Sequence, residues 1–223
     1  MQTMHKTDLQ RTLTINEIFY SIQGESTHAG RPCVFIRLTG CNLRCTYCDT
    51  AYAFYEGEKF TLQTITERIQ GYGCKLVEIT GGEPLLQSNV HFLMEYLCEL
   101  GFEVLLETGG QMDISDVDSR VRRIMDLKCP SSGESEKMLW SNIKQLNSAD
   151  EIKFVVGNRG DYLWAKEKIE RYGLPEICAV LMAPVFNQMD SATLAAWILE
   201  DRLPVRMQLQ MHKLIWGPER RGV

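Results

Sequence analysis

Three cysteine residues stand close together in the chain, and their spacing is well suited to chemistry. Cys41, Cys45 and Cys48 form a C-x3-C-x2-C pattern directly after an apolar segment. Three neighbouring thiolates can hold three corners of a cubane iron–sulfur cluster, which ordinarily takes four protein ligands. The iron without a protein ligand could then bind and activate a small molecule. The spacing therefore predicts a [4Fe–4S] cluster with one open iron.

A zinc site is an alternative use of these cysteines. Structural zinc takes four ligands, usually from two paired motifs, and the sequence offers no second pair. The other cysteines are isolated and mostly lie in apolar contexts, where a free thiol acts as a small hydrophobic side chain. They are Cys33, Cys74, Cys98, Cys129 and Cys178. We therefore favour an iron–sulfur cluster over zinc and over a lone redox-active thiol.

The composition is that of a globular protein, with 223 residues, a formal net charge of −5 and 44% hydrophobic residues. This length fits one α/β domain with a substantial core. The negative charge argues against broad binding to nucleic acid or anionic lipid, although a local basic pocket for a small acidic ligand stays open. No segment has the length to span a bilayer, and residues 1–11 are polar, unlike a secretory leader. We therefore expect a cytoplasmic protein without nucleic-acid or membrane partners, in which clustered cysteines indicate metal binding or catalysis.

Short apolar runs recur along the chain, and each has the length of a buried strand. We expect strands at 33–38, 75–80, 102–107, 121–127, 151–156, 178–183 and 205–210, and helices at 61–70, 88–100, 161–172 and 191–200. Strands that alternate with helices form parallel sheets with right-handed crossovers. About six to seven parallel strands are fewer than a closed eightfold barrel needs. The sequence thus predicts an α/β fold, a partial and open βα barrel, with residues 1–12 as a polar N-terminal extension and 13–223 as a single domain.

Residues with unusual chemistry follow the predicted strands. Parallel strands place their carboxyl ends on one edge, where the active sites of barrels and open sheets are built. Gly and Pro also punctuate ordinary loops, so only their number on one edge indicates a site. The positions are 41–48, 81–84, 107–110, 128–133, Asn158, Pro184, His212 and Lys213.

Two motifs together resemble those of the radical S-adenosylmethionine (SAM) enzymes. One is the cysteine triad with Tyr47 before its last cysteine, and the other is Gly81-Gly82-Glu83-Pro84 after the next strand. The resemblance implies that SAM chelates the open iron through its amino and carboxylate groups. It also implies that the reduced cluster cleaves SAM to methionine and a 5′-deoxyadenosyl radical. A glycine pair suits such a site, because backbone without side chains can approach a ligand closely.

Longer stretches are similar to the family of 7-carboxy-7-deazaguanine synthases, over nearly the whole chain from about Leu13. They are residues 16–25, 30–38, 48–50, 107–109 and 210–213. The resemblance implies conversion of 6-carboxy-5,6,7,8-tetrahydropterin to 7-carboxy-7-deazaguanine with loss of ammonia, a carbon–nitrogen lyase reaction of queuosine and 7-deazapurine biosynthesis. SAM would be regenerated as a true cofactor, and Mg²⁺ would assist. A flavodoxin- or ferredoxin-type reductant and a homodimer are implied as partners.

The resemblance also implies roles for single residues in substrate binding. Arg37 matches the contact to the substrate carboxylate, which suits a planar guanidinium, and its alternative role is a strand-end salt bridge. Glu107 could accept two parallel N–H groups from the guanidine-like edge of the pterin. His212 is expected to close the site together with Lys213, or else to order a backbone turn. The implied substrate contacts are Ile22, Gln23, Gly24, Arg37, Thr80, Glu107 and His212.

Cofactor contacts are implied in the same way. Thr50 matches the magnesium ligand, with Asp49 as a carboxylate alternative, and substrate and water would complete the near-octahedral shell. Ser26 departs from the glycine that the family often has, which narrows the backbone conformations open to it. The implied SAM and cluster contacts beyond Cys41 and Cys45 are Tyr47, Cys48, Asp49, Gly82, Cys129, Pro130 and Ser131.

Two other functions fit the cysteine triad. A glycyl-radical-enzyme activating protein shares the spacing but needs no pterin pocket, so Gln23 and Arg37 argue against it. A non-catalytic electron carrier needs full cysteine ligation, for which no fourth ligand is evident. Lys153 could point into the barrel, but a strand-end lysine is usually solvated, and we interpret it in that way. We interpret residues 219–221 as a solvated tail.

Overall fold

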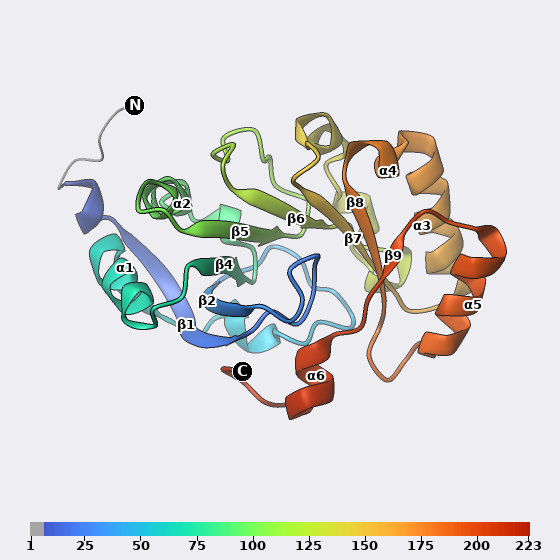
Figure 1. Cartoon of the computed structure of the whole chain (residues 1–223), viewed down its shortest axis with the longest axis horizontal. Coiled ribbons are helices and arrows are strands. Elements are labelled where there is room, and N and C mark those ends of the chain that lie inside the picture. Colours follow the sequence, from blue (N-terminus) through green and yellow to red (C-terminus); the bar gives the residue numbers. More distant parts are fainter. Residues whose placement is uncertain (1–6) are drawn as a thin grey trace.

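The computed structural model describes residues 7–223, which form one mixed sheet with helices packed against it (Figure 1). The strand order is β3-β1-β2-β4-β5-β6-β7-β8-β9. The strands are β1 (Thr12–Ile22), β2 (Pro32–Leu38), β3 (Glu58–Thr61), β4 (Leu76–Gly81), β5 (Glu103–Thr108), β6 (Arg122–Asp126), β7 (Glu151–Val156), β8 (Ala179–Pro184) and β9 (Arg206–Met207). Pairing is parallel from β2 through β9 and antiparallel between β1 and its two neighbours. The linear order of nine strands, seven of them parallel, confirms the predicted open α/β barrel.

The sequence does not predict β1, because its apolar alternation changes phase. Ile15 lies in the core beneath the helices, but the register shifts between Ile15 and Glu17. After this β-bulge Glu17 pairs with Arg37, and Phe19 stacks on Phe35 with ring centroids 4.9 Å apart on the opposite face. Bulges re-aim side chains in this way and are common beside active sites.

The helices follow the prediction more closely than the strand ends do. The structure confirms four of them, α1 (Leu62–Gly71), α2 (Val90–Glu99), α3 (Arg159–Tyr172) and α5 (Ser191–Asp201), and adds the short α4 (Leu174–Ile177) and α6 (Met211–Trp216). The predicted strand at 205–210 is mostly wrong, since only Arg206 and Met207 pair with β8. Asn158, expected near the site, instead caps α3 by accepting the Asp161 backbone N–H at 3.0 Å.

The two faces of the parallel strands differ in character. On β2, Val34 and Ile36 face the large core under the helices, whereas Phe35 belongs to a small apolar cluster on the inner face. This alternation follows from the two-residue period of a strand. Above that small cluster, the inward positions of neighbouring strands carry polar and charged side chains. The inner face is therefore an apolar floor beneath a polar cavity.

The N-terminal segment lies against the domain where it is described. A single-turn 3-10 helix, η1 (Asp8–Gln10), contacts α1, and Leu9 packs against the core. Residues 1–6 of the predicted polar extension lie outside the described residues. Within residues 7–223, no helix combines the length and apolar character needed to cross a membrane.

Candidate active site

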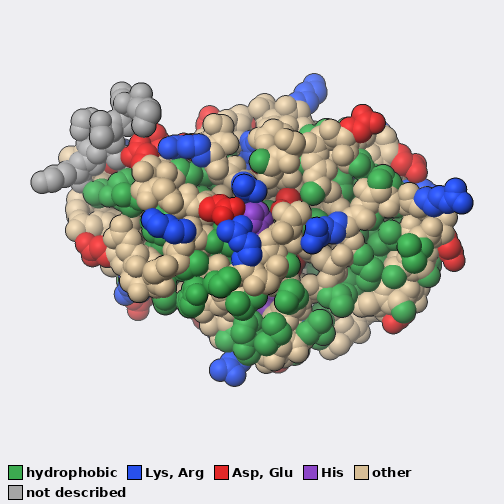
Figure 2. All heavy atoms as spheres, viewed as in Figure 1, with side chains coloured by type: hydrophobic (Ala, Val, Ile, Leu, Met, Phe, Trp, Pro, Cys, Tyr) green, Lys and Arg blue, Asp and Glu red, His purple; other side chains and the backbone are tan. Residues whose placement is uncertain are grey.

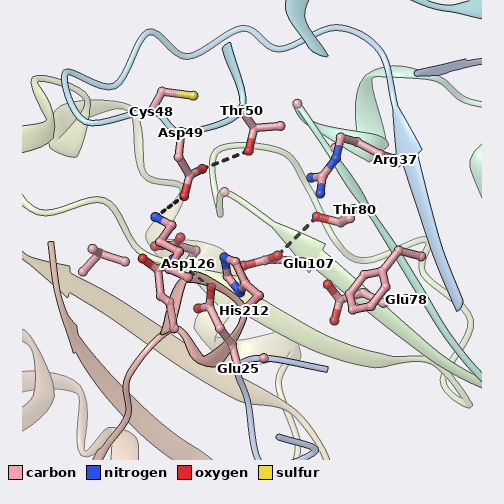
Figure 3. Close-up of a pocket in the computed structure, with 18 of the residues that line it drawn as sticks. Glu25, Arg37, Cys48, Asp49, Thr50, Glu78, Thr80, Glu107, Asp126 and His212 are labelled. Atoms are coloured by element: carbon pink, nitrogen blue, oxygen red, sulfur yellow. Dashed lines mark hydrogen bonds and ion pairs between the residues drawn. The ribbon is translucent and has the colours of Figure 1, made fainter. Parts of the chain in front are cut away.

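A cavity of about 330 Å³ opens at the carboxyl ends of the parallel strands. Figure 2 shows basic and acidic side chains and a histidine gathered near the centre of the face shown. Most of the predicted site residues line this cavity, as Figure 3 shows for several of them. They are Ile22, Gln23, Gly24, Arg37, Cys41, Cys45, Tyr47, Cys48, Asp49, Thr50, Thr80, Gly82, Glu107, His212 and Lys213. The fold thus brings together residues that lie as much as 191 positions apart, from Ile22 to Lys213.

The cysteine loop, residues 41–48, is held from behind by the connection that follows β6. Thr46 donates its backbone N–H to the Ser132 carbonyl at 3.0 Å and its hydroxyl to the Ser131 carbonyl at 2.7 Å. The backbone N–H of Arg44 donates to Glu134 Oε1 at 2.6 Å. These bonds fix the loop through its backbone and leave its thiols free to face the cavity.

The glycine pair after β4 packs directly on the start of the cysteine loop. A Cβ on Gly82 would lie 2.1 Å from the Gly40 carbonyl oxygen, and one on Gly81, whose φ is +141°, would lie 2.3 Å from the Leu38 carbonyl oxygen. The Glu83 backbone N–H donates to the same Gly40 carbonyl at 2.7 Å. Both glycines are therefore required because the protein's own backbone lies against them. This requirement holds independently of any contact that they make with a ligand.

Glu83 joins the ends of two neighbouring strands. Its carboxylate is completely buried and accepts the Thr108 hydroxyl and the Gly109 backbone N–H, each at 2.9 Å. Burial raises the pKa of Glu83 despite these bonds. The acidic residue of the glycine motif thus fixes β4 against β5 at the cavity edge.

The donor set at the cysteine loop fits an iron–sulfur cluster. Cys41, Cys45 and Cys48 all line the cavity. In residues 7–223, no three His, Cys, Asp or Glu side chains converge as a single metal ion requires. A cubane cluster takes each thiolate on a different iron, so its ligands stand apart around it. Burial raises the pKa of the Cys45 thiol to about 11, so iron must displace a proton there.

Cys129, Pro130 and Ser131 do not line the cavity, unlike the other predicted site residues. Cys129 is fully buried in the core, and the Ser131 backbone N–H donates to Asp161 Oδ1 at 2.9 Å. This segment supports the cysteine loop instead of facing the open space. Its contact to SAM stays a prediction that the side chains do not support.

Three charged residues on the inner face were not predicted as part of the site or were given another role. Glu78 on β4, Asp126 on β6 and Lys153 on β7 line the cavity next to Glu107 on β5. Each of these three stands between apolar neighbours in the sequence, as in Ile152-Lys153-Phe154. A charged residue between two apolar ones, found in three of four consecutive parallel strands, is the signal that could have found them.

Lys153 is a buried centre of ion pairs, so its interpretation as a solvated lysine is wrong. It is 4% exposed and lies 3.0 Å from Glu25 Oε2 and 3.4 Å from Asp126 Oδ2, and it also donates to Glu107. Burial alone would lower the pKa of Lys153, but the three carboxylates outweigh it and raise that pKa well above its usual value. Lys153 therefore carries its charge and holds three walls of the cavity together.

Glu78 and Gln23 form a second buried pair. The Gln23 side-chain amide donates to Glu78 Oε2, and both residues are almost fully buried. Burial, reinforced by the charge of Glu107, raises the pKa of Glu78 well above its usual value. This environment favours the protonated carboxyl group of Glu78, which can donate as well as accept a hydrogen bond.

Arg37 forms a salt bridge, one of the two roles considered for it from the sequence, and it also faces the cavity. Its Nε donates to Glu17 Oε1 at 2.7 Å, and the same oxygen accepts the Tyr52 hydroxyl at 3.0 Å. Among the described residues, no hydrogen-bond partner is found for its two Nη atoms. Figure 3 shows its guanidinium end directed into the cavity.

Thr50 and Asp49 share a hydrogen bond, and Asp49 is already paired. The Thr50 hydroxyl donates to Asp49 Oδ1 at 2.9 Å, while Lys213 lies 2.5 Å from Asp49 Oδ2. Burial would raise the pKa of Asp49, but Lys213 outweighs it and holds that pKa well below its usual range. Because Lys213 neutralises Asp49, Thr50 keeps a free lone pair as the better candidate ligand for a cation.

The segment after β9 closes the cavity against the β1–β2 loop, residues 23–31. The Met211 backbone N–H donates to the Gly24 carbonyl at 3.0 Å, and a Cβ on Gly24 would lie 2.6 Å from His212 Nδ1. Burial lowers the pKa of His212, which favours the neutral imidazole. His212 therefore lies at the contact between the two segments, and its role in closing the site stays a prediction.

The C-terminal tail is exposed, as predicted for residues 219–221, and it also lies at the cavity mouth. Residues 218–223 line the cavity although most of their side chains are exposed. The Arg221 guanidinium lies 3.8 Å from the centroid of the Tyr52 ring and 3.4 Å from Glu56 Oε2. No local pattern signals this docking, because it depends on residues far away in the sequence.

Ser26 shows the consequence of the departure from glycine. Its φ is +65°, in the left-handed region that glycine adopts without cost. Two bonds oppose the strain, because the Ser26 backbone N–H donates to Gln208 Oε1 at 2.8 Å and its hydroxyl accepts the His28 backbone N–H at 3.0 Å. The serine thereby ties the β1–β2 loop to the segment after β9.

Comparison with known proteins identifies the family. The model of the radical SAM superfamily matches residues 35–187. A 7-carboxy-7-deazaguanine synthase of Chlorobaculum tepidum is 50% identical over 95% of this chain and 97% of its own length, and one of Koribacter versatilis is 44% identical over 95% and 100%. The chain belongs to the 7-carboxy-7-deazaguanine synthase family of radical SAM proteins. Membership implies a [4Fe–4S] cluster and SAM, which agrees with the cysteine triad at the cavity.

A solved structure supports the fold of this radical SAM chain. The crystal structure of QueE from Escherichia coli matches with a TM-score of 0.77 over 90% of this chain and 95% of that one. The two sequences are only 23% identical, so this likeness concerns the arrangement of sheet and helices.

Proposed function

We propose that this chain converts 6-carboxy-5,6,7,8-tetrahydropterin to 7-carboxy-7-deazaguanine with loss of ammonia. The observation that carries the proposal is one cavity that joins three thiols to Arg37 and Glu107. Close relatives that cover nearly the whole chain bear the name of the synthase. With the cluster and SAM bound, the site gains a source of carbon-centred radicals that can remove a hydrogen atom from a substrate.

The chain's own residues hold and orient that substrate. The free Nη atoms of Arg37 can bind a carboxylate bidentately, which a planar guanidinium does well. Glu107 is oriented by Lys153 and by the Thr80 hydroxyl, which donates to its Oε2 at 3.2 Å. A carboxylate fixed in this way can accept the paired N–H groups of a 2-amino-4-oxo ring. Arg37 and Glu107 thus define the two ends of a carboxylated pterin.

Water must be kept from the reacting carbon, and two contacts serve this purpose. The bond between Met211 and Gly24 holds α6 over the cavity, and Arg221 holds the tail over Tyr52. The floor is the apolar cluster that includes Phe19 and Phe35. An enclosed site of this kind protects a reactive intermediate from side reactions.

We also propose that Mg²⁺ binds at Thr50, with the substrate and water as further ligands. Mg²⁺ usually takes few protein ligands and keeps several waters, so one hydroxyl beside a substrate carboxylate is sufficient. The pairing of Asp49 with Lys213 leaves Thr50 as the oxygen offered by this loop. The lyase class follows from the loss of ammonia in the proposed reaction.

The proposal is tested by anaerobic reconstitution of the cluster, followed by reduction in the presence of SAM, Mg²⁺ and the tetrahydropterin. We expect 7-carboxy-7-deazaguanine to accumulate over many turnovers without matching loss of SAM. In an Arg37→Ala variant we expect the KM to rise about 10-fold to 100-fold, the usual effect of losing a hydrogen bond between charged groups. Absence of a deazapurine product from enzyme that still binds the cluster and SAM would exclude the proposed reaction.

A further inference from the structure

The β-bulge of β1 directs one carboxylate at Arg37. Ile15 faces the helices, and without the register shift Glu17 would face them as well, two residues further on. The shift turns Glu17 to the inner face, where it is the direct cross-strand partner of Arg37. A bulge interrupts the ladder, so its presence beside a cavity indicates that the direction of this side chain matters.

Glu17 occupies one nitrogen of Arg37 and leaves the other two. Its Oε1 accepts the Arg37 Nε–H at 2.7 Å, and the Arg37 side chain is only 16% exposed. The rings of Phe19 and Tyr52 lie 5.8 and 6.0 Å from the guanidinium carbon. The guanidinium is therefore fixed at its base and flanked by rings, while its forked end faces the cavity.

Tyr52 connects this arrangement to the cysteine loop. It lies in η2 (Ala51–Phe54), the 3-10 helix that begins directly after Thr50. Its hydroxyl donates to the same Glu17 oxygen at 3.0 Å. Two donors, from β2 and from η2, thus converge on one carboxylate oxygen.

We propose that Glu17 and Tyr52 are positioning residues that give the site its preference for a carboxylated pterin over one without the carboxylate. The proposal rests on the proposed function, because it assigns the substrate carboxylate to the Nη atoms of Arg37. Glu17 neutralises Arg37 while the site is empty and holds the fork in the plane that a bidentate carboxylate needs. Without Glu17 the guanidinium would be a buried and mobile charge, and binding would have to order it.

Binding measurements without turnover test this directly. The cluster-loaded enzyme is kept oxidised with excess SAM, and 6-carboxypterin and pterin, which differ only in the carboxylate, are titrated by their fluorescence. For Glu17→Ala we expect the Kd of 6-carboxypterin to rise about 10-fold to 30-fold and that of pterin to change less than about 2-fold. For Tyr52→Phe we expect a selective rise of about 2-fold to 10-fold, the range for one neutral hydrogen bond.

Matched variants separate positioning from general damage. Glu17→Gln keeps an oxygen that can accept from Arg37 Nε, so we expect it to retain the wild-type preference within about 3-fold. Glu58→Ala removes an exposed glutamate of β3, and Tyr55→Phe removes the hydroxyl of an exposed tyrosine, so both should behave as wild type. Iron content and thermal unfolding of each variant show whether it is folded.

The outcomes distinguish this proposal from the proposed function. Equal weakening of both ligands in Glu17→Ala would show a merely structural role and overturn the proposal, as would an unchanged preference. If wild-type enzyme makes the deazapurine while Glu17→Ala keeps full discrimination, only the role of Glu17 fails. If the wild-type enzyme binds the two pterins equally, both the carboxylate contact of Arg37 and the positioning role fail.

Discussion

Two walls of the same cavity are held by different forces. On the cysteine wall, residues 40–48 and 81–83, backbone packs on backbone, and Gly82 lies so close to the Gly40 carbonyl that no Cβ fits. On the opposite wall, the β1–β2 loop, side-chain pairs make the contacts. Glu25 pairs with Lys153, and Thr27 donates its backbone N–H to Glu151 at 3.1 Å. One wall depends mainly on shape and the other mainly on charge.

This difference in contacts agrees with the proposed role of each wall. The cysteine wall must present three thiols at fixed positions, and backbone contacts do not respond to pH or salt. The loop wall faces the proposed pterin, where charged groups such as Lys153 and Glu107 select polar edges by hydrogen bonding. We therefore expect changes of shape to affect cluster loading and changes of charge to affect substrate binding.

Gly82→Ala should give the largest effect and confine it to the cysteine wall. Its Cβ would lie 2.1 Å from the Gly40 oxygen and 2.8 Å from the Cys41 Cβ, so the loop must move. Overpacking of this kind costs about 1–3 kcal/mol or more, and we expect iron content and SAM cleavage to be mostly lost. Iron analysis and the visible absorption of the cluster measure the result.

Gly71→Ala is the matched control for that variant. Gly71 ends α1, and nothing lies within 4 Å of the position of its Cβ. Alanine there should leave iron loading unchanged and stabilise the helix by about 0.5–1 kcal/mol. Full iron content in Gly82→Ala would contradict the claim that this wall depends on close backbone packing.

Lys153→Met should damage the loop wall and spare the cysteine wall. The change leaves Glu25, Glu107 and Asp126 without their shared cation, and breaking one side of a buried ion pair costs about 3–5 kcal/mol. We expect a lower melting temperature and a higher KM for the pterin, with iron loading retained under conditions where the variant is folded. Steady-state kinetics and iron analysis measure both quantities. They are made at about 15 °C, well below the usual unfolding temperature of a domain.

A second substitution sharpens this prediction. Lys153→Met combined with Glu107→Gln removes one of the stranded charges, so it should recover part of the lost stability but not the KM. The exposed Lys59 of β3 provides a control, and Lys59→Met should change neither quantity. Loss of the cluster from a folded Lys153→Met protein would show that the two walls are not independent.

The sequence predicts the cysteine wall better than the loop wall, for a physical reason. Backbone packing leaves a signature in residue type, since only glycine fits at Gly81 and Gly82, and chelation requires cysteines at fixed spacing. The parallel strands were likewise evident from apolar runs. What these motifs did not reveal is that the glycines pack on the protein's own backbone as well as lying beside the proposed ligand.

The loop wall is less predictable because its contacts depend on tertiary pairing. Lys153 has partners at positions 25, 107 and 126, none of them near it in the sequence. The bulge before Glu17 breaks the alternation that would have identified β1, and Arg221 reaches Tyr52 across 169 positions. Glu17, Lys153 and Arg221 were given either no role or a solvated one, because a charge considered alone is most often solvated.

The titration of His28 should give the smallest of these effects, and it tests whether the stability of the loop wall depends on charge. The Arg31 Nη1–H group donates to His28 Nδ1 at 2.6 Å, which requires that this nitrogen is unprotonated. Other charged groups also act on the ring. They are Glu103 on β5, Arg122 on β6 and Glu151 on β7. Burial lowers the pKa of His28 below its usual 6.5 in spite of these carboxylates. The unfolded loop therefore binds a proton that the folded loop does not, and the loop loses stability as the pH falls below about 6.5.

Hydrogen exchange, corrected for its intrinsic pH dependence, should show residues 23–31 less protected at about pH 5.5 than at 7.5, and residues 40–48 unchanged. In His28→Gln the difference at 23–31 should be much smaller, whereas an equal loss of protection in both segments would mean that the two walls respond to pH as one unit.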